Sequence, residues 1–233
     1  MLQISDKVYC DELFNSIEVE NKILPSPYKE YPYFIIENFL SPEFLQEIAI
    51  SIQASTNLKK AKVKIQTDNG IIDNELNEIH RKTNIYFFSE EQTKFYHNQF
   101  LKYKKEIEDF YNVILTNSTE IQALEYKKGY FYVKHADDSS ELVDDDGNTV
   151  GFLNIAPQRK LTTVLFCTNC DEYDGGELKF NYLYDKEGNY KIIKPNAGDM
   201  IVFPSNPIYS HEVMEVKSGY RLTAVQWHDA MVL

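Results

Sequence analysis

The spacing of apolar residues changes near residue 121, and this change constrains the fold more than any other feature of the sequence. From there to residue 228, apolar side chains recur at every second position, in short runs separated by turn residues. This spacing is typical of β-strands, because successive side chains of a strand point to opposite faces. We predict strands over 121–126, 130–135, 161–167, 177–182, 190–193, 200–203 and 220–228.

Two helices are predicted before this β-rich part, with a short strand over 33–36 preceding the first. Ser41 followed by Pro42 is a typical helix start, and we expect the Ser41 hydroxyl to accept a free backbone N–H. Apolar residues then recur at helical spacing over 44–52. A second, long helix begins at Ser89, with Gln92 completing a capping box. Its predicted apolar face contains Phe95, Tyr103, Ile107, Phe110 and Ile114.

The order of these elements, helices first and many short strands afterwards, predicts the fold class. It favours a mainly β domain, an antiparallel sandwich or barrel, with the flanking helices packed on one side. No repeat or Gly/Ser/Pro-rich linker divides the 233 residues, so we predict a single domain over 33–233. Residues 1–32 are expected to form an irregular N-terminal arm, whose role the sequence does not indicate.

The net charge limits the possible partners. The chain has 24 basic and 36 acidic residues, a formal charge of −12, which opposes binding to nucleic acid or to an anionic membrane. No apolar run approaches the roughly 20 residues that span a bilayer, and the N-terminus lacks the pattern of a signal peptide. The three cysteines do not suggest a disulfide framework. We therefore expect a cytoplasmic protein, and the sequence makes no prediction about its oligomeric state.

Candidate metal ligands lie on the predicted strands. His135 and Asp137 are two residues apart, so they can point to the same face and bind one ion. This pair alone is weak evidence, because about one such spacing is expected by chance in this composition. His211 follows a later strand and turn and adds a second imidazole. Two histidines and one carboxylate form the facial triad of non-haem iron, which leaves positions open for a bidentate cosubstrate and dioxygen.

Arg221 is the candidate for the far end of such a cosubstrate. It lies ten residues after His211, on the last predicted strand, and shares one face with Thr223, Val225 and Trp227. Its planar guanidinium can bind a carboxylate through two parallel hydrogen bonds. A dicarboxylate that chelates the metal at one end is therefore expected to meet Arg221 at the other.

Seven short elements follow one another along most of the chain. They are YFIIENFLSP at 33–42, YKKGYFYVKHAD at 126–137, RKLT at 159–162, GGEL at 175–178, KPNAGDMIVFP at 194–204, HEV at 211–213 and GYRLTAVQW at 219–227. In this order they resemble the Fe(II)/2-oxoglutarate-dependent oxygenases of the prolyl-hydroxylase type, which include the prolyl 4-hydroxylases. A looser resemblance, from His135 to the GGE element, is to the leprecan-type prolyl 3-hydroxylases.

The resemblance implies a double-stranded β-helix, or jelly roll, that binds Fe(II) through His135, Asp137 and His211. It implies 2-oxoglutarate as cosubstrate, held at its distal carboxylate by Arg221 with Tyr126 and Thr162 as further hydrogen-bonding candidates. Dioxygen is the oxidant, and ascorbate is a further candidate cofactor. The implied reaction is hydroxylation of an unactivated C–H. Many prolyl 4-hydroxylases have a lysine at the position of Arg221. The arginine keeps the contact with the cosubstrate but weakens the resemblance to this one branch. The candidate substrates therefore include a prolyl residue, a free amino acid, another peptide or another small molecule.

Two functions of other classes remain open from the sequence. The first is a catalytically silent jelly-roll module that uses its cleft only for binding. The second is a cupin-type metal enzyme that does not use 2-oxoglutarate. The intact ligand positions and Arg221 argue against the first of these, and loss of activity on removing Arg221 would argue against the second.

Other residues that attract attention have simpler interpretations. Cys167 and Cys170 have the spacing of a zinc pair, but no second pair accompanies them, so burial of Cys167 is the better explanation. Gly175-Gly176 does not open a helix and is no phosphate loop. The segment 138–158 is expected to be a long acidic loop that does not fit a calcium site. Its acidic residues near the cavity mouth suggest a substrate with an amine or a basic group; they are Asp138, Glu141, Asp144, Asp145 and Asp146.

Overall fold

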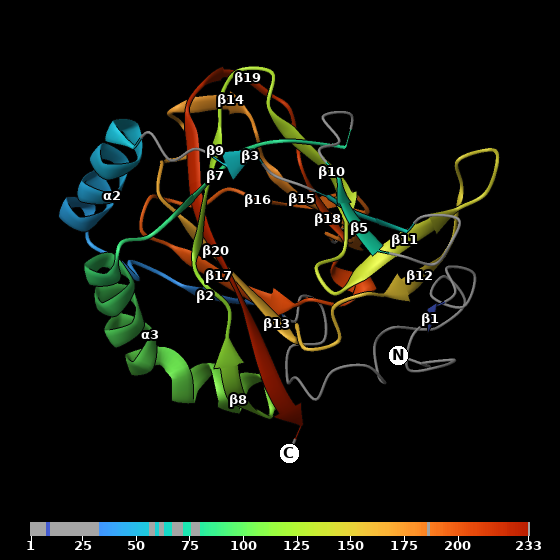
Figure 1. Cartoon of the computed structure of the whole chain (residues 1–233), viewed down its shortest axis with the longest axis horizontal. Helices are drawn as coiled ribbons and strands as arrows, with labels where there is room; N and C mark the ends of the chain where they lie inside the picture. Colours follow the sequence, from blue (N-terminus) through green and yellow to red (C-terminus); the bar gives the residue numbers. More distant parts are fainter. Residues whose placement is uncertain are drawn as a thin grey trace.

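The structure is a computed structural model that describes residues 8–9, 33–55, 59–60, 63–66, 72–75, 80–185 and 187–232. Two sheets face each other in the described residues (Figure 1). The larger contains, in spatial order, β2 (Phe34–Ile36), β17 (Met200–Pro204), β13 (Leu161–Phe166), β20 (Arg221–Val232), β9 (Gln122–Tyr126), β7 (Asn84–Phe87) and β3 (Lys59–Lys60), with β8 (Val113–Ser118) also paired to β20. The smaller contains β16 (Tyr190–Ile193), β15 (Leu178–Tyr184), β18 (His211–Val213), β10 (Phe131–His135) and β6 (Arg81–Lys82).

Three small sheets complete the described strands. They are β1 (Val8–Tyr9) with β12 (Thr149–Asn154) and β11 (Ser139–Val143), β14 (Tyr173–Gly175) with β19 (Val216–Gly219), and β4 (Val63–Gln66) with β5 (Ile72–Glu75). All the strand pairings are antiparallel. This confirms the predicted mainly β fold, and the seven strands predicted from 121 onward lie where the period of two placed them, whereas β11, β12, β14, β18 and β19 were not predicted.

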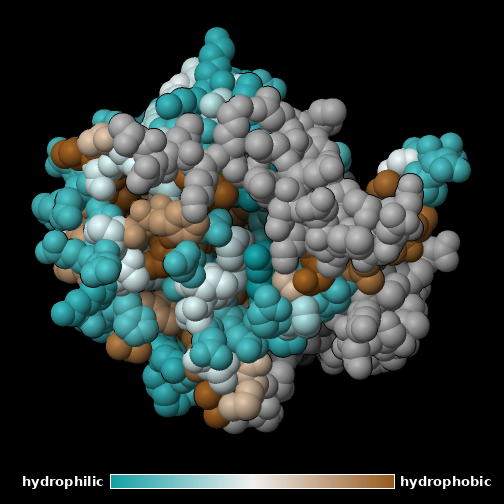
Figure 2. Space-filling view, viewed as in Figure 1, coloured by the Kyte–Doolittle hydropathy of each residue, from teal (hydrophilic) through white to brown (hydrophobic). Residues whose placement is uncertain are grey.

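Two hydrophobic cores follow from the alternation of side chains on the central strands. On β13, Val164 and Phe166 point between the two sheets and pack against residues of β15 and β18. Leu161 and Leu165 point to the other face and pack under the helices α2 (Pro42–Ala54) and α3 (Glu90–Tyr111). Figure 1 shows both helices on the same side of the large sheet, as predicted, and Figure 2 shows mainly hydrophilic atoms on their outer surfaces.

The first helix follows the prediction except at its cap. Its buried residues are Phe44, Leu45, Ile48 and Ile52. Ser41 has the extended backbone of an N-cap, but its hydroxyl accepts no hydrogen bond from the helix. Instead, a hydrogen bond from Ser41 lowers the pKa of Glu43 in the first turn.

The second helix has the predicted start but not the predicted end. Ser89 and Gln92 form the capping box, with Gln92 N donating to Ser89 Oγ at 3.2 Å. Asn112 adopts a left-handed conformation, φ 53°, which ends the helix and places Ile114 on the unpredicted strand β8. The buried face consists of Gln92, Tyr96, Phe100, Ile107 and Tyr111. The prediction was therefore wrong for Phe95 and Ile114, which are 47% and 40% exposed.

The acidic segment is not the irregular loop that the sequence predicted. Residues 139–154 form the hairpin β11–β12, and Val8–Tyr9 adds a third strand to β12. Asp144 closes the turn, because its carboxylate accepts hydrogen bonds from the backbone of Asp146 and Asn148.

Apart from Val8–Tyr9, the predicted N-terminal arm over 1–32 lies outside the described residues, and so does Cys10. Neither helix in the described part of the chain combines the length and apolar character needed to cross a bilayer.

His228 is buried in the core on the helix side of β20. Its ring stacks on Phe100 with centroids 4.7 Å apart, and its nitrogens lie 2.8 Å from Ser118 Oγ and 3.1 Å from Thr163 Oγ1. His228 is therefore a hydrogen-bonded residue of the core. Burial lowers the pKa of His228 to about 3.

We expect Ile48→Ala to destabilise the fold far more than Ile50→Ala in the same helix. Ile48 is fully buried and Ile50 is 59% exposed. The first change should lower the free energy of unfolding by about 2–5 kcal/mol and the second by about 0.5 kcal/mol or less, measured by urea denaturation. Equal losses would show that α2 does not pack as described.

A second expectation concerns acid. The pKa of His228 is lower in the folded state than in the unfolded state, so the unfolded state takes up the proton first and stability is lost as the pH falls below about 6.5. Between about pH 7.5 and about pH 5, this histidine should account for a loss of roughly 2 kcal/mol. Urea denaturation of His228→Gln should therefore show a flatter pH profile than the wild type. Parallel profiles would contradict the assignment.

Candidate metal centre

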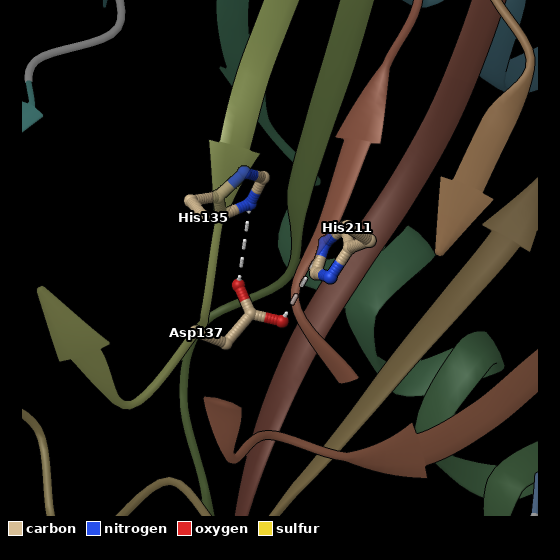
Figure 3. A group of neighbouring side chains, drawn as sticks. All are labelled: His135, Asp137 and His211. Carbon is tan, nitrogen blue, oxygen red and sulfur yellow. Dashed lines mark ion pairs between the residues drawn. The ribbon is translucent and has the colours of Figure 1, made fainter. Parts of the chain in front are cut away.

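The pairing of β10 with β18 brings the two histidines together. His135 and His211 are directly opposite partners in the antiparallel register. Asp137 follows β10 by two residues and is held by the backbone, because its N–H donates to the carbonyl of Ser205 at 3.1 Å. All three side chains are directed to one point between the sheets (Figure 3).

The donor atoms are close enough to share one ion. His135 Nε2 lies 3.8 Å from Asp137 Oδ1, and His211 Nε2 lies 3.9 Å from Asp137 Oδ2. One ligand atom from each residue can be chosen so that all lie within 4.8 Å of one another. Metal bonds to nitrogen and oxygen of about 2.0–2.2 Å fit such spacings after small adjustments. The residues therefore fit a metal ion, and their types fit ferrous iron.

Backbone carbonyls fix the orientation of both imidazoles. His135 Nδ1 lies 2.9 Å from the carbonyl oxygen of Val133, and His211 Nδ1 lies 2.9 Å from that of Tyr209. A carbonyl only accepts, so each Nδ1 carries the proton and each Nε2 presents its lone pair to the centre. Burial and the nearby His211 lower the pKa of His135 to about 3, which keeps this imidazole neutral, as a metal ligand must be.

Asp137 is kept ionised by its neighbours. Burial by itself would raise the pKa of this carboxyl, but the two imidazoles, the hydroxyl of Thr162 and Arg159 outweigh it, and the pKa is lowered. Thr162 Oγ1 donates to Asp137 Oδ2 at 2.7 Å and is also 2.8 Å from Ser205 Oγ. Arg159 Nη1 donates to the main-chain carbonyl of Asp137 at 2.9 Å. These contacts fix the carboxylate in its ligand position.

The triad opens into a cavity of about 1000 Å³ that also contains Arg221. Arg221 is 2% exposed, and its guanidinium carbon lies 4.8 Å from the centroid of the Tyr126 ring. Its Nε and Nη1 are buried without hydrogen-bond partners. Unpaired donors on a buried cation favour an anionic ligand, so this residue fits the distal carboxylate of a dicarboxylate cosubstrate.

Gly176 makes room for the stem of Arg221. A Cβ at this position would lie 3.1 Å from Arg221 Cδ and 2.8 Å from Val216 Cγ2, and the backbone has φ +66°. No other residue meets both conditions without displacing the arginine. The Gly175-Gly176 turn therefore supports the position of the guanidinium.

The cosubstrate contacts predicted for Tyr126 and Thr162 remain predictions. Both residues line the cavity. Tyr126 lies under the guanidinium of Arg221, whereas the Thr162 hydroxyl is already engaged with Asp137 and Ser205. In the structure Thr162 orients a metal ligand.

The comparison with known families agrees with this geometry. The sequence model of the 2OG-Fe(II) oxygenase superfamily matches residues 121–229, which contain the triad and Arg221. This stretch belongs to the 2OG-Fe(II) oxygenase superfamily. The described architecture is the jelly roll of these oxygenases, with the helices on one side.

Individual relatives of this chain are named as hydroxylases. A "PKHD-type hydroxylase" of Gluconacetobacter diazotrophicus is 31% identical over 107 residues, which cover 46% of this chain and 41% of that protein. The chain thus spans about two fifths of the length of that curated relative.

Two solved structures share the fold. The viral collagen prolyl hydroxylase of Paramecium bursaria Chlorella virus-1, in complex with 2-oxoglutarate, has a TM-score of 0.57 at 19% identity, covering 86% of this chain and 97% of that one. A Trichoplax adhaerens prolyl hydroxylase, in complex with a hypoxia inducible factor peptide fragment, has a TM-score of 0.59 at 17% identity, covering 85% of this chain and 83% of that one.

Several residues around the centre were not predicted from the sequence. Arg159 and Tyr132 entered the sequence analysis only as parts of motifs, and no role was predicted for Ser205 or Arg81. Tyr132 stacks on His135 with centroids 3.5 Å apart. Arg81 lies over the ring of Tyr132. It belongs to the two-residue strand β6, which is too short to show a periodicity in the sequence. The one available signal was composition, because the chain has three arginines and 21 lysines.

The remaining histidines and cysteines are away from the centre. His80 and His97 are exposed. Cys167 is buried in the core under the helices, and both Cys167 and Cys170 are free thiols. Burial raises the pKa of the Cys167 thiol to about 12, which fits a packing role.

The acidic residues do not surround the cavity mouth as expected. Asp138 is buried and accepts a hydrogen bond from Ser139 Oγ at 2.6 Å. Glu141 lines the cavity, but it is paired with Lys134. The other three acidic residues, Asp144, Asp145 and Asp146, lie exposed at the hairpin turn. The expectation of a substrate with an amine or a basic group is therefore corrected. Asp138 is buried, Glu141 is paired with Lys134, and the other three acids face solvent.

We expect Thr162→Val to weaken metal binding. Loss of the hydrogen bond to Asp137 should lower Fe(II) affinity by about 10–100-fold, measured by anaerobic titration. Thr163→Val is the matched control, because Thr163 faces away from the cavity and donates to the carbonyl of Gln226. It should lower stability and leave metal affinity unchanged. Equal affinity in both variants would show that Thr162 does not orient the ligand.

Proposed function

We propose that this protein is an Fe(II)- and 2-oxoglutarate-dependent dioxygenase that hydroxylates an unactivated C–H. The single observation that carries the proposal is that one cavity contains both the His135–Asp137–His211 triad and the buried guanidinium of Arg221, whose Nε and Nη1 have no hydrogen-bond partner. A metal alone would not need a second, distant anion site. A keto-dicarboxylate needs both.

The residues of the chain would position the metal and the cosubstrate, supply the charge that binds the cosubstrate, and exclude water from the cavity. Ferrous iron and 2-oxoglutarate supply the hard chemistry when bound, using dioxygen to oxidise the cosubstrate to succinate and carbon dioxide and to place one oxygen on the substrate. His135, Asp137 and His211, which line the cavity, would hold the ion. Arg221 orients the cosubstrate, and the apolar walls formed by Leu178, Val213 and neighbouring residues exclude water.

The proposed substrates are a peptide, an amino acid or another small molecule. A peptide is supported by the Trichoplax relative, which was solved with a peptide fragment, and a prolyl residue by the prolyl hydroxylases of similar fold. The cavity volume of about 1000 Å³ is at the upper end of ordinary ligand pockets, so it can hold a cosubstrate and part of a substrate together.

We also propose a cytoplasmic location, which the free Cys167 and Cys170 support.

Two measurements test the proposal. The first is an anaerobic titration of the protein with Fe(II) and 2-oxoglutarate, which should give the visible charge-transfer band of the chelate. The second is metal-dependent release of succinate on exposure to oxygen. A chain that binds neither would be a silent module, and the proposal would be wrong.

The role of Arg221 gives a sharper test. Arg221→Gln should raise the KM for 2-oxoglutarate by about 10–100-fold, because a buried charge-assisted pair is lost. Lys217→Gln, which removes an exposed cation on β19, is the control and should behave as the wild type. If substrate oxidation continued unchanged in Arg221→Gln, the enzyme would be of the cupin type that does not use 2-oxoglutarate.

A further inference from the structure

All the arginines of this protein line one cavity. The sequence has 21 lysines but only Arg81, Arg159 and Arg221, and each of the three contributes to the wall of the cavity that contains the metal triad. A guanidinium differs from an ammonium in its planar fork, which fits a carboxylate with two parallel hydrogen bonds. Arg221 accounts for the cosubstrate. The other two arginines need a separate explanation.

Arg81 is the most informative of these. It is 7% exposed, and its guanidinium carbon lies 4.4 Å from the centroid of the Tyr132 ring, which in turn stacks on the metal ligand His135. Its Nε is buried without a hydrogen-bond partner. No acidic side chain in the described part of the chain forms an ion pair with it. A buried cation in this condition is costly unless an anion joins it.

Arg159 lies in the same group. Its guanidinium carbon is 3.9 Å from the centroid of the Trp227 ring, and one nitrogen is used by the carbonyl of Asp137. Its Nε is also buried and unpaired. Burial lowers the pKa of Arg159, the carboxylate of Asp137 raises it and the charge of Arg81 lowers it, so both charged groups lie near this guanidinium. Asp137 therefore compensates part of the charge of the two arginines, and an anionic ligand in the cavity would compensate the rest.

The charges of the cavity leave room for a second anion. Among the described lining residues, the cations are Arg81, Lys134, Arg159 and Arg221, and the acids are Asp137 and Glu141. Lys134 and Glu141 neutralise each other. Asp137 and a 2-oxoglutarate dianion would together offset the three guanidiniums, and a ferrous ion would then restore a positive excess. This excess occurs in a chain whose overall charge is −12.

We propose that Arg81, assisted by Arg159, binds a carboxylate of the substrate. The substrate is then a free amino acid, a chain end or another compound with a carboxylate close to the C–H that reacts, and not an internal residue of a polypeptide. This inference rests on the proposed function, and it replaces the basic substrate suggested by the acidic segment. Tyr132 connects Arg81 to His135, so the anchored carboxylate lies beside the metal rather than at the rim of the cavity.

The test compares acids with their uncharged analogues. The holoenzyme, with Fe(II) and saturating 2-oxoglutarate, is given the protein amino acids as free acids, as N-acetyl acids and as carboxamides. The rate of succinate release above the rate without substrate is measured, and products are examined by mass for one added oxygen. At least one acid should stimulate release, and its carboxamide should have a kcat/KM about 10- to 100-fold lower. The N-acetyl acids distinguish a chain end from a free amino acid.

Variants of Arg81 test whether this residue causes the preference for an acid over its carboxamide. Arg81→Gln should reduce the acid-to-carboxamide ratio toward one, and Arg81→Lys should retain part of it, because the charge remains but the fork is lost. Lys82→Gln is the matched control, because it removes a neighbouring cation of β6 that does not line the cavity. It should keep the wild-type ratio. A purely structural role for Arg81 would lower both rates equally and leave the ratio unchanged.

Three outcomes would overturn the inference: equal use of acid and carboxamide by the wild type, stimulation by no acid, or an unchanged ratio in Arg81→Gln. None of these affects the chelate band formed by Fe(II) and 2-oxoglutarate. Failure of this inference is therefore distinguishable from failure of the proposed function, in which the band itself would be absent.

Discussion

The antiparallel pairing of β10 with β18 is the constraint on which the rest of the site depends. It places His135 opposite His211, and each imidazole is then turned by a carbonyl two residues before it in its own segment. A shift of one residue in this register would direct one of the two rings to the opposite face of the sheet. The cores on either side of the large sheet, formed under the helices and between the sheets, hold that register in place.

A second constraint is the burial of charge. The protein buries the guanidiniums of Arg81 and Arg221 and half-buries that of Arg159. Each is supported by an aromatic ring: Arg81 by Tyr132, Arg159 by Trp227 and Arg221 by Tyr126. Rings provide contact without neutralising the charge, so they position the cations and leave their hydrogen-bond donors available. The same arrangement is used at both ends of the cavity, once for the cosubstrate and once, as we propose, for the substrate.

The sequence predicted those parts of the molecule that depend on local periodicity. Seven of the strands after residue 121, the start of both helices, the triad and Arg221 follow from spacing or from ordered motifs. The end of α3 was predicted wrongly, because it depends on the left-handed backbone of Asn112, which apolar spacing does not reveal. The hairpin β11–β12 was missed because its acidic turn conceals two short strands.

Arg81 could not be predicted from a pattern, because its strand has only two residues and its neighbours come from β10. The resemblance implied that Thr162 binds the cosubstrate, whereas in the structure its hydroxyl donates to Asp137. Its hydroxyl could be assigned to Asp137 only when the strand β13 and the segment after β10 were seen together. Contacts between segments distant in sequence are the part of the site that spacing alone does not contain.

The space left at Gly176 has an evolutionary consequence. The stem of Arg221 lies next to the space that a side chain at position 176 would occupy. A side chain at 176 would press on both Val216 and the stem of Arg221, although 45 positions of sequence separate Gly176 from Arg221. A lineage that replaced this glycine would therefore have to change the packing of its cosubstrate anchor as well.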